Sequence, residues 1–226
     1  LGHRQLLRRV VDVALQSGRP AVAMSFEPTP KEFFGGDQPP ARLMRFREKL
    51  DALDERKIDI FFCPRFGEAM RSISADAFIR RVLVHGLNAR HIVIGDDFHF
   101  ARRREGSIKD LLRVAPALDM TIERVPSILV GDTRVSSTVI REALALGDLD
   151  RATALLGRPY RMSGRIMRGR QVGRSLGYPT ANVDLRRRRS AVMGNKALRV
   201  HGLQEGPLDG VASVGTRPTF DLVKPL

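Results

Sequence analysis

Four stretches of the sequence carry residue types that could bind phosphate groups, and the first of them is Gly2-His3. Both residues stand at the expected start of a helix, where free backbone N–H groups and the positive end of the helix dipole favour an anion. Glycine lets the backbone approach a ligand closely, and histidine can donate a hydrogen bond to a phosphate oxygen. The pair is a candidate phosphate site, although a histidine in a surface loop would have the same sequence.

The second stretch is Val135–Arg141, which reads Val-Ser-Ser-Thr-Val-Ile-Arg. Ser136 or Ser137 is expected to cap a helix over residues 138–146, and Arg141 follows one turn in. Hydroxyl groups, free N–H groups and a guanidinium then converge, as a clamp on a triphosphate requires. An ordinary helix cap beside a solvated arginine would have the same sequence.

The third stretch is Gly95-Asp96-Asp97-Phe98-His99-Phe100, which follows an expected strand and precedes Arg104 and Gly106. Ligands of parallel α/β sheets bind beyond the carboxyl ends of the strands, so the position suits a binding site. Aromatic rings beside acidic groups could hold a flat, polar-edged ligand. The alternative is a turn that is filled by phenylalanines of the core.

The fourth stretch runs from Gly164 to Asn182 and contains glycines that allow tight backbone around phosphates, Gly169 and Gly173 among them. Thr180 and Asn182 are two residues apart in an extended segment, so their side chains share a face. Neutral oxygens of this kind suit a magnesium ion that is bound mainly through substrate phosphates. Taken alone, the same basic string could be an RNA-binding hairpin.

The spacing of apolar residues predicts the elements that position these stretches. Helices are expected over residues 4–16, 43–53, 75–84 and 107–114, and strands over residues 21–26, 58–63, 91–95 and 121–125. This alternation predicts an α/β domain with a parallel sheet. Such a sheet normally begins with a strand, so a strand is expected before Leu1.

A domain boundary is expected at Gly157. Two helices lead up to it, the first over residues 138–146 with Gly147 at its end, the second starting at Asp148 and stopping at Gly157. We therefore expect one domain over residues 1–157.

The remaining residues, 158–226, are expected to form a second, small domain. Glycines recur along it, and the segments between them predict an antiparallel β unit, with strands over residues 160–165, 197–201 and 210–214. Four consecutive arginines, Arg186–Arg189, fall on an expected loop. The strands are too few to close a barrel, so the C-terminal part of this domain is expected to be missing.

Charge and composition narrow the possible partners. The net charge of the chain is +14, and residues 158–226 hold 14 basic but only 4 acidic residues. Such a segment favours an anionic partner: a nucleic acid, an anionic lipid or a phosphorylated small molecule. Aromatic residues make up 6% of the chain, which is few for stacking on nucleic-acid bases. No apolar run approaches the roughly 18 residues of a membrane helix.

The only cysteine is Cys63, so no disulfide can form within the chain. This suits a reducing compartment, and we expect the cytoplasm. Paired cysteine ligands for zinc are likewise excluded.

The four stretches, in this order, resemble one family. The string Gly-Arg-Ser-Leu-Gly-Tyr-Pro-Thr-Ala-Asn at 173–182 resembles the ATP-binding signature of riboflavin kinases. Val135–Arg141 resembles a nucleotidylyltransferase motif, and Gly2-His3 resembles the end of that superfamily's His-x-Gly-His motif. Ser25-Phe26-Glu27-Pro28 and Gly95–Gly106 match two further positions. Over essentially its whole length the chain resembles the bacterial bifunctional riboflavin kinase/FMN adenylyltransferases, also called FAD synthetases.

The resemblance implies a Rossmann-like nucleotidylyltransferase domain followed by a small antiparallel β-barrel riboflavin kinase domain. It implies that the 5′-hydroxyl of riboflavin attacks the γ-phosphate of ATP to give FMN. The FMN phosphate then attacks the α-phosphate of a second ATP to give FAD and pyrophosphate. Mg²⁺ is the implied cofactor and ATP the co-substrate; the partners are riboflavin, FMN and ATP, with no nucleic acid and no membrane.

The resemblance also implies roles for individual residues. The ATP of the adenylyltransferase would be held by Gly2, His3, Ser137, Thr138 and Arg141, with His3 and Arg141 as the catalytic residues. Asp97 and Phe98 would lie near the flavin. The ATP of the kinase would be held by Gly169, Gly173, Thr180 and Asn182, with Thr180 and Asn182 at the metal.

The chain departs from the family pattern at several positions. Thr29 stands where the family has a histidine, Ala101 where it has a glycine, and Lys196 where it has apolar strand residues. The glutamate base of the family's kinase would lie beyond Thr219, and residues 220–226 contain no glutamate. Two other functions would fit part of the sequence: a nucleotidylyltransferase for another phosphorylated acceptor, and a basic RNA-binding protein.

Overall fold

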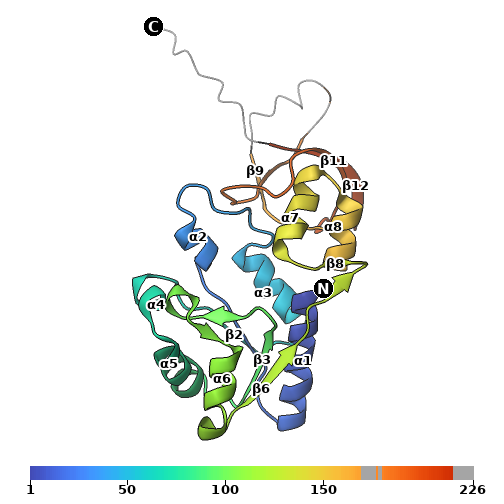
Figure 1. The fold of residues 1–226 in the computed structure, drawn as a ribbon. Helices are drawn as coiled ribbons and strands as arrows, with labels where there is room; N and C mark the ends of the chain where they lie inside the picture. The colour runs from blue at the N-terminus through green and yellow to red at the C-terminus, as the bar shows by residue number, and fades with distance from the viewer. Residues whose placement is uncertain (169–176, 178–179, 216–226) are drawn as a thin grey trace.

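The computed structural model describes residues 1–168, 177 and 180–215. The elements before residue 157 are α1 (Gly2–Ser17), β1 (Val22–Met24), α2 (Pro30–Phe34), α3 (Phe46–Asp54), β2 (Ile60–Phe62), α4 (Glu68–Ser72), α5 (Ala75–Ala77), η1 (Phe78–Gly86), β3 (His91–Gly95), β4 (His99–Phe100), η2 (Arg102–Arg104), β5 (Gly106–Ser107), α6 (Ile108–Val114), η3 (Pro116–Leu118), β6 (Thr121–Val125), β7 (Leu129–Val130), β8 (Thr133–Arg134), α7 (Ser137–Leu146) and α8 (Leu149–Leu156). Those that follow are β9 (Arg165–Met167), β10 (Asn182–Asp184), β11 (Gly194–Val200) and β12 (Leu208–Val214). In Figure 1, β2, β3 and β6 lie in one body with α1, α4, α5 and α6, whereas β9, β11 and β12 lie beside α7 and α8.

The longer strands of the first half pair in parallel, as the alternation of helices and strands predicts. β1 pairs with β2, and β3 pairs with β6 so that His91 lies opposite Thr121. Because β3 and β6 are parallel, the residues that follow them meet at one edge. There the carboxylate of Asp96 accepts a hydrogen bond of 2.8 Å from the backbone N–H of Ser127. The expected parallel sheet is thereby confirmed.

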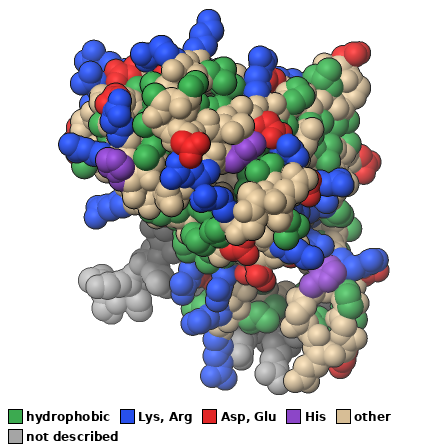
Figure 2. All heavy atoms as spheres, turned by 90° about the horizontal axis from the view of Figure 1, so that it is seen from below, with side chains coloured by type: hydrophobic (Ala, Val, Ile, Leu, Met, Phe, Trp, Pro, Cys, Tyr) green, Lys and Arg blue, Asp and Glu red, His purple; other side chains and the backbone are tan. Residues whose placement is uncertain are grey.

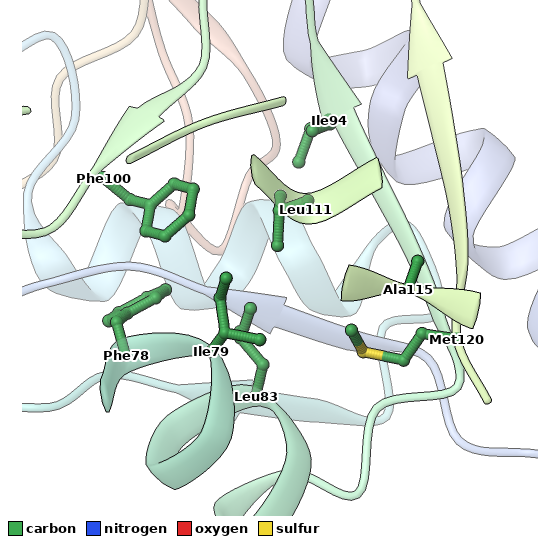
Figure 3. Close-up of a cluster of buried hydrophobic side chains, with 8 residues drawn as sticks. All are labelled: Phe78, Ile79, Leu83, Ile94, Phe100, Leu111, Ala115 and Met120. Atoms are coloured by element: carbon green, nitrogen blue, oxygen red, sulfur yellow. The ribbon is translucent and has the colours of Figure 1, made fainter. Parts of the chain in front are cut away.

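A buried hydrophobic cluster fixes the end of β3. Its members come from η1, β3, β4, α6 and the segment after α6: Phe78, Ile79, Leu83, Ile94, Phe100, Leu111, Ala115 and Met120. Figure 3 shows these side chains pointing toward one another between η1, α6 and the strands. The helix expected over residues 75–84 begins as α5, capped by Ser74, and continues as a π-helix in η1.

Helices α7 and α8 begin and end where their capping residues predict. The Ser136 hydroxyl accepts a hydrogen bond of 3.3 Å from Val139 N–H, and the Asp148 carboxylate accepts one of 3.0 Å from Arg151 N–H. Gly147 and Gly157 end the two helices with φ of 77° and 69°, which glycine adopts without steric cost. Ser136, rather than Ser137, is therefore the cap of α7.

The second half consists of antiparallel hairpins, as expected. β9 pairs with β10, and β11 pairs with β12 over seven residues each. The strand expected over residues 160–165 is wrong, because β9 begins only at Arg165. The backbone N–H of Ser163 donates to the carboxylate of Glu48 at 2.8 Å, so this segment pairs with α3 instead of with a strand.

The two halves share a core. Ala191 and Val192, which are 5% and 3% exposed, pack with Ile140, Ala143, Leu144, Ala152 and Leu155 of α7 and α8. The structure gives a reason for Lys196, which stands where the family has apolar strand residues. A Cβ atom at Gly147 would lie 3.6 Å from its ammonium nitrogen, so this cation sits at the C-terminal end of α7, where the helix dipole favours it.

Candidate active sites

The head of α1 is held by the end of α8. The guanidinium of Arg4 donates a hydrogen bond of 2.9 Å to the carbonyl of Gly157. A Cβ atom at Gly157 would lie 2.4 Å from a methyl carbon of Leu1, so only glycine allows this approach. Gly2 and His3 are thereby fixed at the start of a 16-residue helix.

His3 is exposed to solvent but has an altered pKa. The protein around the ring desolvates the imidazolium form and lowers the pKa of His3 below 6.5, while the negative charge of Asp97 acts in the opposite direction. The side chain is therefore neutral at pH 7, with one ring nitrogen able to donate and the other able to accept. The charge effect places Asp97, which follows β3, within electrostatic reach of His3.

Asp97 also ties the end of β3 to the segment before α7. Its carboxylate pairs with the guanidinium of Arg134 at 3.0 Å, and Arg134 is the last residue of β8. Ser136, the cap of α7, follows two residues later. Arg134 therefore links Asp97 to the segment that leads into α7. Arg134 has no signal in the sequence, because only the folded chain brings it to Asp97.

The remaining predicted residues of this site lie on the first turns of α7. Thr138 is exposed, and Ser137 and Arg141 are half-buried. Arg141 donates hydrogen bonds of 3.0 Å to the carbonyl of Ser137 and 2.6 Å to the carbonyl of Ala41. Burial lowers the pKa of the Arg141 guanidinium below its ordinary value, although the group stays a cation at neutral pH. It is not the solvated arginine of the plainer interpretation.

The phenylalanines after β3 belong to the core at least in part. Phe100 is 7% exposed, and the ring of Phe98 stacks on it with centroids 5.6 Å apart. A Cβ atom at Gly106 would lie 2.6 Å from the Phe100 ring, so Gly106 is required for packing. Phe98 is half-buried at the rim of this cluster, beside the exposed Asp97.

A cluster of charged side chains lies after β1. Arg42 pairs with both Glu27 and Glu32, and Lys49 lies 3.8 Å from Glu27. The carboxylate of Glu32 also accepts hydrogen bonds of 2.9 Å from the backbone N–H and the hydroxyl of Thr29. Thr29 is the cap of α2, so the residue that replaces the family's histidine has a structural role here.

This cluster predicts acid sensitivity. Burial disfavours ionised Glu32, but the hydrogen bonds from Arg42 and Thr29 outweigh burial and lower its pKa from 4.5 to about 2. Because the folded-state pKa is depressed, the stabilisation is present above pH 4.5 and is lost as the pH falls toward 2. Glu32→Gln is expected to lower the free energy of unfolding at pH 7 by about 2 kcal/mol. The free energy of unfolding of this variant is also expected to change less with pH between 4.5 and 2 than that of the parent protein.

The measurement is urea denaturation across that range of pH. Glu68→Gln is the matched control, because Glu68 pairs with Arg71 at 3.0 Å but its side chain is 71% exposed. This control is expected to change the free energy of unfolding by less than about 0.5 kcal/mol. An acid transition that is the same in Glu32→Gln and the parent protein would contradict the assignment.

The second candidate site lies at β10. Asn182 is its first residue, paired with Met167 of β9, and Thr180 lies two residues before; both side chains are exposed. Gly169 and Gly173 lie outside the described residues. Within the described part of the chain, no group of three or more His, Cys, Asp or Glu side chains could hold a metal ion.

The arginine run after β10 is largely engaged with the protein itself. Arg187 pairs with Glu48, Arg186 with Asp184, and Arg189 donates to Gln38. On the face drawn in Figure 2, Lys and Arg side chains are interspersed with acidic and hydrophobic ones rather than joined in one patch.

The helices that the structure describes include none that is long and apolar enough to cross a membrane.

The fold is similar to that of a protein from Streptococcus pneumoniae whose crystal structure is described as a macrolide-efflux protein. The TM-score is 0.81 at 28% sequence identity, over 97% of this chain and 71% of the other.

Two family models match the chain in succession: FAD synthetase over residues 1–139 and riboflavin kinase over residues 156–225. The bifunctional riboflavin kinase/FMN adenylyltransferase of Escherichia coli K12 is 43% identical over 96% of this chain and 70% of its own length. Its namesake from Haemophilus influenzae is 39% identical over 98% of this chain and 72% of its own length. This chain therefore belongs to the family of bifunctional riboflavin kinase/FMN adenylyltransferases.

Proposed function

We propose that the protein phosphorylates riboflavin to FMN with one ATP and adenylylates FMN to FAD with a second ATP, releasing pyrophosphate. The observation that carries this proposal is the succession of two family matches along one chain. The first match contains Gly2, His3, Ser137 and Thr138 and ends two residues before Arg141, and the second contains Thr180 and Asn182. We further propose domains over residues 1–157 and 158–226, the second built on an antiparallel β barrel, and a cytoplasmic location.

The adenylyl transfer is assigned to residues at the start of α1, after β3 and at the start of α7. In this step an oxygen of the FMN phosphate forms a bond to the α-phosphorus of ATP, and the bond from that phosphorus to the bridging oxygen of pyrophosphate breaks. The free backbone N–H groups at the head of α1 can bind an anionic group, and neutral His3 can donate a hydrogen bond to a phosphate oxygen. Catalysis of this type depends on positioning and charge stabilisation.

Ser137, Thr138 and Arg141 complete this site in our assignment. The first turn of α7 offers hydroxyl and N–H donors, and the guanidinium of Arg141 supplies positive charge beside them. Asp97 and Phe98 are assigned to the flavin. The pairing of Asp97 with Arg134 and the stacking of Phe98 on Phe100 hold both residues at the rim of the site.

The phosphorylation of riboflavin is assigned to the strand segment around β10. The hydroxyl of Thr180 and the side-chain oxygen of Asn182 would hold magnesium together with ATP, and Gly169 and Gly173 would lie along the phosphates. Bound there, magnesium would neutralise charge on the phosphate oxygens. The 5′-hydroxyl oxygen of riboflavin then bonds to the γ-phosphorus, ADP leaves, and the hydroxyl proton passes to a base.

Gly2→Ala separates ligand approach from folding. A Cβ atom at Gly2 would meet no protein atom within 4 Å, so the fold does not require glycine there. We expect the thermal midpoint to be unchanged or raised, because alanine favours a helix. The KM for ATP in adenylylation is expected to rise by about tenfold, because the methyl group holds the phosphates away from the helix N–H groups.

Steady-state kinetics with FMN and ATP measures this effect. Gly67→Ala is the matched control, since a Cβ atom there also meets nothing within 4 Å and Gly67 begins another helix, α4. An equal KM for ATP in Gly2→Ala and the parent protein would mean that Gly2 does not lie against the phosphates of ATP.

A chromatographic product assay tests the proposed function as a whole. Riboflavin, ATP and magnesium are expected to yield FMN first and FAD later. FAD from added FMN, but none from riboflavin, would restrict the activity to the N-terminal half. If FMN with ATP gives no FAD, the adenylyltransferase assignment is wrong, and other phosphorylated acceptors become the next substrates to test.

A further inference from the structure

Resting on the proposed adenylyl transfer, we propose that Arg187 is a positioning residue for that reaction, although it lies within the riboflavin kinase match. Its side chain reaches from the second half of the chain to the backbone segment that also anchors Arg141. The segment is the loop Ala41–Met44. Its first two carbonyls accept hydrogen bonds from Arg141 and Arg187.

Arg187 is the buried member of its run. Its side chain is 2% exposed, whereas Arg186, Arg188 and Arg189 are exposed residues. The guanidinium donates a hydrogen bond of 2.6 Å to the carboxylate of Glu48 and one of 2.5 Å to the carbonyl of Arg42. A third, of 3.2 Å, goes to the hydroxyl of Tyr160. A solvated loop arginine needs none of these partners.

The segment that binds Arg187 also binds Arg141, which is assigned to the adenylyl-transfer site. The carbonyl of Ala41 accepts the 2.6 Å hydrogen bond from Arg141, and the next carbonyl, that of Arg42, accepts Arg187. Two consecutive carbonyls are therefore held by arginines from different halves. The two carbonyls lie in adjacent peptide units that meet at the Cα atom of Arg42, so a displacement of that atom changes the position of both.

The same segment reaches the loop after β1. The side chain of Arg42 pairs with Glu27 and Glu32, and its backbone is the part that Arg187 holds. Arg187 therefore holds a backbone segment that makes two further sets of contacts. The carbonyl of Ala41 binds Arg141, and the side chain of Arg42 binds Glu27 and Glu32. This makes Arg187 a residue that acts through others and does not itself touch ATP.

Docking of the two halves does not depend on Arg187 alone. Glu48 also accepts hydrogen bonds of 2.8 Å from the backbone N–H of Ser163 and 3.0 Å from its hydroxyl. Ala191 and Val192 remain packed on α7 and α8. Loss of the Arg187 contacts is therefore expected to shift the segment at Ala41 while the halves stay joined.

The test is FAD formation from FMN and ATP with Arg187→Lys in the full chain. Lysine keeps the charge but cannot bind Glu48 and the Arg42 carbonyl with the fork of a guanidinium. We expect the KM for ATP to rise about fivefold, which lies within the interaction energies measured for residues of one hydrogen-bond network. The KM for FMN is expected to be unchanged. Arg188→Ala removes an exposed charge from the same run and is expected to leave both constants unchanged.

A purely structural role is excluded by a double-mutant cycle with Arg141→Lys. If Arg187 acts through Arg141, the double variant is expected to raise the KM for ATP little more than Arg141→Lys alone. Independent effects would multiply. Arg187→Met with Glu48→Gln avoids leaving a buried carboxylate unpaired and serves as the second variant should Arg187→Lys not fold.

The outcomes separate the two proposals. If the parent protein makes no FAD, the proposed function fails and the inference fails with it. If the parent protein is active and the Arg187 variants keep the parental KM for ATP, the inference alone is overturned. Multiplicative effects in the cycle would likewise overturn it, because they would mean that Arg187 does not act through Arg141.

Discussion

Replacing His3 by alanine is expected to slow FMN adenylylation by about two to three orders of magnitude, the usual cost of removing one donor to developing charge. His3 stands at the head of α1, is neutral at pH 7 because its pKa is lowered, and is exposed to solvent, where a triphosphate can reach it. Its removal deletes a hydrogen bond to phosphate and leaves the helix in place. The measurement is the rate of FAD formation from FMN and ATP.

Two comparisons make the His3 result specific. Gln5→Ala alters an exposed residue on the same turn region of α1 and is expected to leave adenylylation unchanged. Riboflavin phosphorylation by His3→Ala is also expected to equal that of the parent protein, because its assigned residues lie at β10. Equal losses of both reactions would point to damaged folding, and full adenylylation would exclude His3 from the site.

The second large effect is expected from Asn182→Ala. Loss of the side-chain oxygen should lower riboflavin phosphorylation by at least about 100-fold, since the proposed magnesium and phosphate contacts there rest on few protein oxygens. Conversion of added FMN to FAD should continue at the parental rate. Asn182 is exposed and pairs with Met167 through its backbone, so alanine is expected to preserve β10.

The measurement is the time course of FMN and FAD from riboflavin, in the protein as the cell makes it. Val183→Thr is the matched control, because Val183 is the next residue of β10, 48% exposed, and its side chain points to the opposite face. The assignment of Asn182 would be wrong if the control and Asn182→Ala phosphorylated riboflavin equally well.

Elements with local signals could be predicted from the sequence. The ends of α7 and α8 follow from Ser136, Gly147, Asp148 and Gly157, because capping depends on residues within one turn. β3 and β6 have the bounds expected from their β-branched runs, His91–Gly95 and Thr121–Val125. The five-residue helix α2 was not predicted, because it is too short to show periodicity and depends on Thr29 and Glu32.

The candidate sites were only partly predictable. Gly2, His3 and the head of α7 carry motifs, but the charge effect of Asp97 on His3 and the pairing of Asp97 with Arg134 depend on tertiary structure. The burial of Arg187 had no signal at all. Its three neighbours are also arginines, and the partner that selects it, Glu48, lies 139 residues earlier in the chain. Composition at such a position cannot reveal which residue is buried.

The shared core of the two halves bears on how the protein is made. The apolar faces of α7 and α8 are complete at Leu156, but Ala191 and Val192 reach the ribosome's exit only later. At typical rates of synthesis, residues 158–192 take about 2 to 7 seconds. During that interval the nascent chain exposes the surface around Leu144 and Leu155 to chaperones and to other nascent chains. An expression fragment that stopped at Gly157 would expose it permanently, so a recombinant N-terminal half should extend through Val192.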